Sequence, residues 1–260
     1  MGEYLDIGGH PTWVDQRGSG AETVLLLHGG MSNSDLLLDA VGAPLAERHR
    51  LVAFDRRGHG YTADTPAPFH YEDMAAETIG VLEAVVGQRA HLVGWSDGGI
   101  ICLLVALRRP DLVDRMVLIG ANFHFDGVVG GFDLPEDSPF ASAILEAYAE
   151  RSPDGGEHFG EIFGKFMAMV TTEPTLSTDD LGRITAPTLV MAGDDDAVLL
   201  PHTCEMYEAL PAGQLSIVPG ASHALPIERP DVTARTVLDF LGAEVPPATL
   251  IPVRRAGAIA

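Results

Sequence analysis

The sequence predicts an α/β protein in which a mostly parallel, eight-stranded sheet is flanked by helices. Two observations predict this class. Short apolar runs bounded by turn residues recur along the chain and alternate with segments of helical period. The later runs, among them VLLL, LVAF and MVLI, are continuously apolar, which is typical of parallel strands covered on both faces. This alternation predicts right-handed crossovers between neighbouring parallel strands.

Each expected strand is a short apolar run bounded by turn residues. The expected strands are Tyr4–Ile7, Thr12–Gln16, Val24–His28, Leu51–Asp55, His91–Trp95, Arg115–Ile119, Thr188–Ala192 and Leu215–Val218. The expected helices between and after them are Asp35–Glu47, Tyr71–Val86, Gly98–Arg109, His202–Leu210 and Asp231–Leu241.

A long insertion, residues 122–182, interrupts this alternation. It holds two helical stretches, Ala141–Arg151 and His158–Val170, and we interpret it as a helical lid over the sheet. Its aromatic residues Phe123, Phe125 and Phe163 either line a substrate pocket or form the lid's own small core. The domain prediction is therefore a core of residues 1–121 and 183–245, a lid of residues 122–182 and a C-terminal tail of residues 246–260.

Composition limits the function further. The net charge of −21 over 260 residues repels nucleic acid and anionic membranes, so we expect a small-molecule substrate. No apolar stretch approaches a membrane span, and the N-terminus lacks a signal-peptide pattern, so the expected location is cytoplasmic. The two cysteines, Cys102 and Cys204, suggest neither a disulfide framework nor a zinc site. The oligomeric state is not indicated.

The segment GWSDG, residues 94–98, fits the pattern G-x-S-x-G directly between an expected strand and an expected helix. Such a turn holds the serine backbone in a strained conformation, so small neighbours are needed on both sides. It lifts the hydroxyl of Ser96 above the end of the strand, where the N–H groups of the next helix also point. The pattern predicts a nucleophilic serine.

A serine hydroxyl becomes reactive only with a base in hydrogen-bond reach and a third group that orients the base. In this architecture the chain order is serine, acid, histidine. His223, in a loop before the last helix, is the expected base. Asp196, which follows a strand in the segment GDDD, is the expected acid, with Asp194, Asp195 and Asp126 as alternatives.

Three other histidines lie near these motifs, and we do not expect any of them to be the catalytic base. We expect His202 to be a helix cap or a surface residue, and His28 to be structural. His59 belongs to the segment DRRGHG, residues 55–60, which we interpret as a braced turn and not as part of the catalytic machinery.

Attack of the serine on a carbonyl group creates a negatively charged oxygen, the oxyanion, which needs two hydrogen-bond donors. The backbone N–H of Asp97, the residue after the nucleophile, is the first. The loop HGGM, residues 28–31, supplies the second, which we assign to Gly30 with Met31 as the neighbouring candidate. Met31 is also a candidate substrate contact.

Together these motifs resemble the α/β-hydrolase fold family. HGG, DRRGHG, GWSDGG, GDDD and the SH of residues 222–223 occur in the family's order, over about residues 20–242. A closer likeness is to the valacyclovir hydrolase, or biphenyl-hydrolase-like, group, through GWSDGGI at 94–100 and RRPDLVDRMVLIGAN at 108–122. That resemblance implies a serine esterase that prefers α-amino acid esters, with Asp97 engaging the substrate's ammonium group. The HGG stretch departs from the form typical of that group.

Asp97 has a second interpretation, because aspartate is also favoured as a cap at the start of a helix. The two roles are compatible.

These inferences predict a serine hydrolase that cleaves a small carboxylic ester through an acyl-enzyme, without a cofactor or a metal. A lactonase or a carbon–carbon bond hydrolase using the same triad is one alternative. A non-catalytic ligand-binding protein on the same fold is another.

Overall fold

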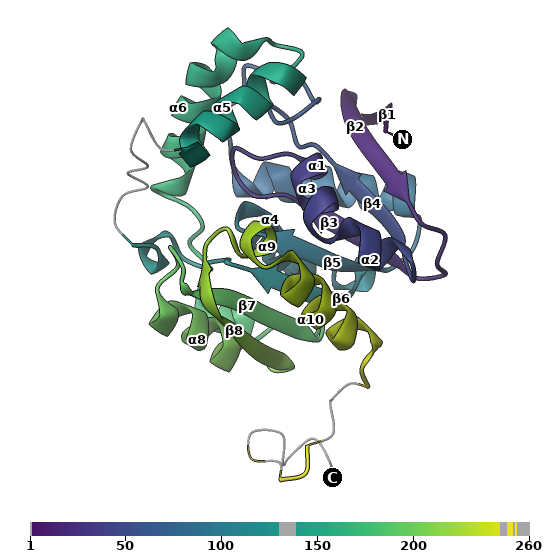
Figure 1. The fold of residues 1–260 in the computed structure, drawn as a ribbon, viewed down its shortest axis with the longest axis vertical. Helices are drawn as coiled ribbons and strands as arrows, with labels where there is room; N and C mark the ends of the chain where they lie inside the picture. Colours follow the sequence, from purple (N-terminus) through teal and green to yellow (C-terminus); the bar gives the residue numbers. More distant parts are fainter. Residues whose placement is uncertain (1, 130–138, 245–248, 252, 254–260) are drawn as a thin grey trace.

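One mixed sheet of eight strands organises the molecule, in the order β1-β2-β4-β3-β5-β6-β7-β8 (Figure 1). The computed structural model describes residues 2–129, 139–244, 249–251 and 253, so most of the expected tail lies outside the described residues. β2 pairs antiparallel with both β1 and β4, and the remaining pairings, from β4 to β8, are parallel. The predicted fold class is confirmed.

The strands match the eight expected apolar runs, with ends that shift by a few residues. They are β1 (Glu3–Ile7), β2 (His10–Arg17), β3 (Thr23–Leu27), β4 (Arg50–Phe54), β5 (Ala90–Trp95), β6 (Val113–Ile119), β7 (Thr188–Asp195) and β8 (Gly213–Ser222). The last two are longer than expected, and their pairing ends with Asp195 opposite Ser222. Asp196 and His223 therefore follow adjacent positions at the same edge of the sheet.

The helices flank this sheet. The α-helices are α1 (Ser34–Leu37), α2 (Ala43–Ala46), α3 (Tyr71–Val81), α4 (Asp97–Arg108), α5 (Pro139–Arg151), α6 (Phe159–Val170), α7 (Thr178–Leu181), α8 (Leu200–Ala209), α9 (Leu225–Glu228) and α10 (Pro230–Gly242). Two π-helical segments, η1 (Leu38–Gly42) and η2 (Leu82–Val86), and three 3-10 turns, η3 (Pro110–Leu112), η4 (Phe125–Gly127) and η5 (Gly156–His158), complete the set. None of the helices in the described part of the chain is both long and apolar enough to cross a membrane.

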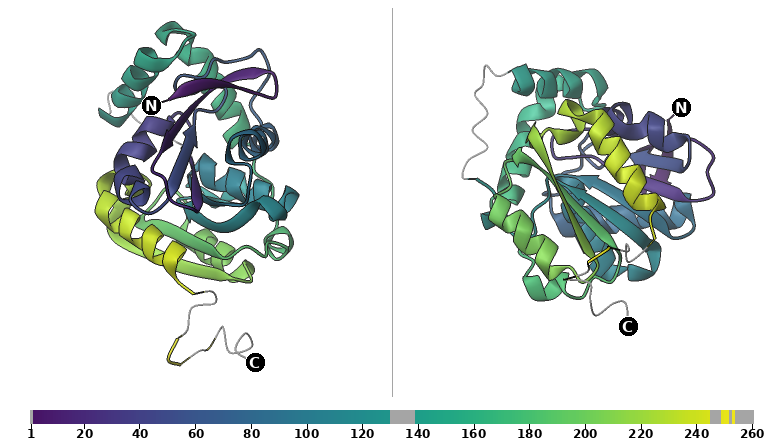
Figure 2. Two further views of the ribbon diagram at one scale, coloured as in Figure 1. Left: turned by 90° about the vertical axis from the view of Figure 1, so that its right-hand side faces the viewer. Right: turned by 60° about the horizontal axis from the view of Figure 1, so that its bottom comes forward.

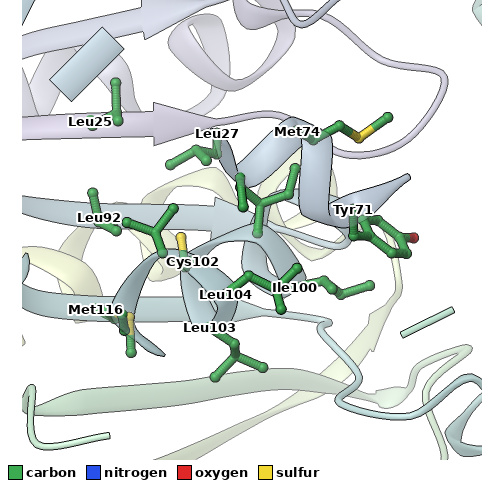
Figure 3. Close-up of a cluster of buried hydrophobic side chains, with 14 of the residues drawn as sticks. Leu25, Leu27, Tyr71, Met74, Leu92, Ile100, Cys102, Leu103, Leu104 and Met116 are labelled. Carbon is green, nitrogen blue, oxygen red and sulfur yellow. The ribbon is translucent and has the colours of Figure 1, made fainter. Parts of the chain in front are cut away.

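Apolar side chains fill both faces of the sheet because neighbouring strand residues point to opposite sides. Leu25, Leu92 and Met116 pack with α3 and α4 on one face (Figure 3). The alternate positions, such as Val24 and Val93, pack with α1, α2 and α10 on the other. This two-sided burial is the reason for the continuous apolar runs in the sequence.

The expected helix over residues 35–47 consists of α1, η1 and α2, which follow one another without a gap. Pro44 lies in the first turn of α2, and a proline has no N–H to give to the preceding turn. The widened π-helical segment before it accommodates this loss, and the chain is helical from Ser34 to Ala46, so the predicted helix is confirmed with a π-helical turn in its middle.

The insertion between β6 and β7 carries α5 and α6, which lie together beyond the end of the sheet (Figures 1 and 2). Ion pairs connect it to the core. Lys165 of α6 donates to the Asp64 carboxylate over 2.6 Å, and Arg151 of α5 donates to Asp35 over 3.1 Å. The contacts place the insertion over the loops that follow β3 and β4.

Candidate active site

Ser96 stands at a strained turn between β5 and α4. Its φ of 53° is positive, a conformation that side-chain-bearing residues seldom adopt. A Cβ at Gly94 would lie 2.3 Å from the backbone of Gly98, and a Cβ at Gly98 would lie 2.1 Å from the carbonyl oxygen of Leu27. The two glycines are therefore required by close backbone approach, and the hydroxyl of Ser96 stays partly accessible.

The structure brings Ser96, His223 and Asp196 together in one hydrogen-bonded chain. Ser96 Oγ lies 2.9 Å from His223 Nε2, and Nδ1 of the same ring lies 2.7 Å from Asp196 Oδ1. The Asp196 side chain is buried at 2% exposure, whereas the imidazole is 22% exposed. Gly120, with a φ of 57°, lies beneath this pair, where a Cβ would come within 3.1 Å of the ring. The arrangement gives a base with a fixed orientation and an open side.

The loop that carries His223 is held from several directions. The indole N–H of Trp95, the residue before Ser96, donates to the His223 carbonyl over 2.8 Å. The Asp194 carboxylate accepts from the backbone N–H groups of residues 220 and 221, and Glu228 accepts from the N–H and hydroxyl of Ser222. Asp194 thus braces the loop, whereas Asp196 is the carboxylate hydrogen-bonded to the imidazole.

The loop after β3 lies against the serine. A Cβ on Gly29 would lie 3.4 Å from the Cβ of Ser96. The fully buried Arg56 holds this loop, because its guanidinium donates to the carbonyl oxygens of His28 over 2.7 Å and Gly29 over 2.9 Å. Among the described residues, neither Gly30 N–H nor Asp97 N–H makes a hydrogen bond, so both donors are free. Met31 has a φ of 52° at the end of the loop.

The Asp97 carboxylate lies beneath the insertion. The residue is 3% exposed, and its Oδ1 accepts a hydrogen bond from the Tyr71 hydroxyl over 2.7 Å. Its Oδ2 has no hydrogen-bond partner among the described residues and lies 2.6 Å from the position of a Cβ on Gly30. Burial raises the pKa of Asp97, and the Arg56 guanidinium and the Tyr71 hydroxyl oppose this shift. Among the described residues the carboxylate accepts no hydrogen bond from an N–H of α4, so the geometry does not support the capping interpretation.

The aromatic residues proposed as pocket lining lie in different environments. Phe123 is buried and stacks on His202 with ring centroids 3.9 Å apart, and half-buried Phe125 stacks on His124. Phe163 is 45% exposed, so its assignment to a pocket needs correction. The opposite face of α6 turns inward, and Phe166 lies 2.4 Å from the position of a Cβ on Gly30.

His202 is not the surface or capping residue that the sequence suggested. It is half-buried, and its Nε2 accepts from the Phe123 N–H over 3.1 Å. Burial lowers the pKa of His202 to about 4. The imidazole of His202 is therefore uncharged at neutral pH, and it packs against Phe123 at the start of the insertion.

The other candidate residues lie outside the hydrogen-bonded chain. His28 accepts from the Arg56 N–H and His59 stacks on Phe69, both fully buried, in keeping with structural roles. The side chain of Asp126 is 75% exposed and pairs with His124, while Asp195 is exposed.

Sequence reasoning missed three side chains around the serine: Trp95, Arg56 and Tyr71. All three act through contacts between segments far apart in the chain, so no local spacing indicates them. Groups of three side chains able to hold a metal ion occur twice in the described part of the chain, and neither contains Ser96, Asp196 or His223.

Comparison with known proteins agrees with this architecture. The sequence model of the alpha/beta hydrolase family matches residues 24–236. The protein named "Putative carbamate hydrolase RutD" of Variovorax paradoxus (strain S110) is 33% identical over 244 residues, which cover 85% of this chain and 91% of that protein. "Serine hydrolase BPHL" of Mus musculus is 29% identical over 246 residues, which cover 86% of this chain and 80% of that protein. A solved serine hydrolase involved in carbazole degradation, the CarC enzyme, shares the fold with a TM-score of 0.80 at 22% identity, covering 93% of this chain and 98% of that one.

The fold and these matches define a hydrolase, an enzyme that acts on small molecules. The chain belongs to the alpha/beta hydrolase family, and the expected likeness to the biphenyl-hydrolase-like group is confirmed.

Proposed function

We propose that the chain is a serine hydrolase that cleaves a small carboxylic ester through an acyl-enzyme intermediate. One observation carries the proposal: Ser96 Oγ is 2.9 Å from an imidazole whose other nitrogen is 2.7 Å from a buried carboxylate. Hydrogen bonds of this length allow the proton transfer that makes a serine nucleophilic.

The steps follow from the three side chains. Ser96 Oγ attacks the ester carbonyl carbon while His223 Nε2 takes its proton. The protonated imidazole, stabilised by Asp196, then gives that proton to the leaving alcohol as the carbon–oxygen bond breaks. Water attacks the acyl-enzyme with His223 again as the base, which releases the acid and restores the serine.

The negative oxygen of each tetrahedral intermediate needs donors fixed in advance. The free backbone N–H groups of Gly30 and Asp97 flank Ser96 and fit this role. Arg56 fixes the position of the first donor, because two of its N–H groups hold the carbonyl oxygens immediately before Gly30.

We infer an α-amino acid ester as the preferred substrate. A buried carboxylate without enough partners stabilises a cation that can donate to it. Asp97 Oδ2 is buried, has no hydrogen-bond partner among the described residues and lies beside Gly30, so we assign it to an ammonium group next to the scissile carbonyl. Phe166 covers the same place and supplies an apolar contact for the acyl side chain.

The same three side chains can also open a lactone, cleave a carbon–carbon bond beside a carbonyl, or hydrolyse a carbamate. A panel with one substrate of each class, compared by kcat/KM, separates these reactions from ester hydrolysis.

The direct test replaces Ser96 with Ala. We expect loss of turnover of nitrophenyl acetate and loss of labelling by a fluorophosphonate, with an unchanged melting temperature. Ser216→Ala, on β8 away from the strand ends, is the matched control and should keep both properties. Turnover by a folded Ser96→Ala protein would refute the mechanism, and unlabelled wild-type protein would favour a non-catalytic binding role.

A further inference from the structure

A second cluster of polar side chains lies at the amino-terminal ends of the parallel strands, whereas Ser96 lies at the carboxyl-terminal end of β5. Glu22 directly precedes β3, His49 directly precedes β4, and His91 is the second residue of β5. One ligand atom from each lies within 4.8 Å of the others. His91 and Ser96 are five residues apart on one extended strand and its end, which separates the two sites by about 16 Å.

The two histidines of this cluster are buried, and three of their four ring nitrogens have no hydrogen-bond partner among the described residues. His91 is 2% exposed, and neither of its ring nitrogens has a hydrogen-bond partner among the described residues. His49 is 6% exposed, and its Nδ1 is also unpartnered. Buried polar atoms nearly always have partners, so two such imidazoles side by side indicate a missing ligand.

We propose that Glu22, His49 and His91 bind a divalent transition-metal ion, with Zn²⁺ as the best match. Two imidazoles and one carboxylate form a donor set that zinc prefers, and the fourth position is left for water. The nearest ligand atoms around a tetrahedral zinc lie about 3.4 Å apart. The Glu22 side chain is 66% exposed and can move inward to complete this geometry.

The surroundings of His91 fit a metal ligand. Its Nε2 faces Glu22 at 3.7 Å, and its Nδ1 faces the Asp114 carboxylate at 3.3 Å. A ligating histidine commonly presents its second nitrogen to a carboxylate, which fixes the ring. The pairing of β5 and β6 shifts register between Ala90 and Leu92, the interval in which His91 and Asp114 lie. An open pocket of about 440 Å³, lined by Glu22, His91 and Asp114 among others, gives an ion access.

The second group of possible ligands, Asp64, His158 and Glu161, provides a contrast. Lys165 Nζ donates to Asp64 Oδ2 over 2.6 Å and lies 3.4 Å from Glu161. A resident ammonium therefore already neutralises this group. No cationic side chain occupies the corresponding place between Glu22 and His91 in the described residues, although Arg89 pairs with the outer oxygen of Asp114.

A bound ion would connect the starts of three adjacent parallel strands. We therefore expect it to stabilise the fold and to leave the chemistry at Ser96 unchanged. The sequence gives no hint of such a site, because its ligands are separated by 27 and 42 residues and come together only through strand pairing.

The test uses the full chain, without an affinity tag, after treatment with a chelator. Titration with ZnCl₂ in competition with a chromophoric chelator should give one ion per chain and a raised melting temperature, and CoCl₂ should give the visible bands of a tetrahedral site. Glu22→Gln and His49→Gln should each weaken binding at least about tenfold. His158→Gln, from the contrasting group, should bind as the wild type does.

Glu22 is exposed, so its variant should fold even if His49→Gln does not. Absence of stoichiometric zinc binding in the wild type would overturn the proposal. So would wild-type affinity in Glu22→Gln, or a loss of binding confined to His158→Gln.

Discussion

Replacing Asp97 with Asn tests the proposed preference for amino acid esters most directly. The substitution keeps the size of the side chain and the backbone N–H that we assign to the oxyanion, and it removes only the charge. In the folded protein this carboxylate is 3% exposed, and its Oδ2 has no partner among the described residues. Its interaction with a substrate ammonium would therefore be poorly screened by water.

The expected loss follows from this environment. Removing one member of a buried, hydrogen-bonded charge pair costs about 2–5 kcal/mol. The nearby Arg56 guanidinium already offsets part of the charge of Asp97, so we expect about 2–3 kcal/mol. At about 1.4 kcal/mol for each factor of ten, this is about a 30- to 150-fold loss of kcat/KM.

The assay compares the p-nitrophenyl esters of phenylalanine and of hydrocinnamic acid, which differ only by the amino group. Asp97→Asn should lower kcat/KM for the first by this factor and change the second by less than about threefold. Asp179→Asn, an exposed aspartate on α7, is the matched change of charge and should alter neither. Equal losses for the two esters would refute ammonium recognition and leave Asp97 with a structural role.

Two further predictions concern the groups behind the site. Trp95→Phe removes the indole N–H that donates to the His223 carbonyl. Because one hydrogen bond is lost, kcat/KM should fall about fivefold. Unchanged kinetics in a folded variant would contradict a positioning role for Trp95. Burial lowers the pKa of His59 to about 3 from its ordinary 6.5, so the unfolded chain takes up this proton before the folded chain does. Stability should therefore fall as the pH drops from 6.5 towards 3, by about 2 kcal/mol at pH 5 from this residue. Urea unfolding should show a smaller pH dependence in His59→Gln, and an identical dependence would exclude the assignment.

The sheet and the serine turn could be predicted because their signals are local. A continuous apolar run identifies a strand buried on both faces, and G-x-S-x-G between such a run and a helix identifies the turn. Parallel strands bring their carboxyl ends to one edge, so residues that follow β5, β7 and β8 must meet there. The structure places Ser96, Asp196 and His223 at that edge within hydrogen-bond distance of one another.

The inward face of the insertion could not be predicted, and α6 shows why. Phe159, Phe163 and Met167 form one apolar stripe at helical spacing, and Ile162, Phe166 and Met169 form another. Either stripe satisfies the period of a half-buried helix. The choice depends on how the helix docks on the loops of the core, where the Lys165–Asp64 ion pair fixes its rotation. The second stripe is the buried one.

We expect the proposed chemistry and the space around the acyl group to depend on different parts of this chain. The Ser96–His223–Asp196 chain depends on strand ends and on braces from Trp95 and Asp194, all of which belong to the core. The insertion contributes Phe166 above Gly30 and Asp97 but no member of that chain. A change in the docking of α6 would therefore alter the space around the acyl group while the proposed nucleophile and base keep their geometry. This separation explains why ester selectivity should respond to Phe166 independently of the rate with a minimal ester such as nitrophenyl acetate.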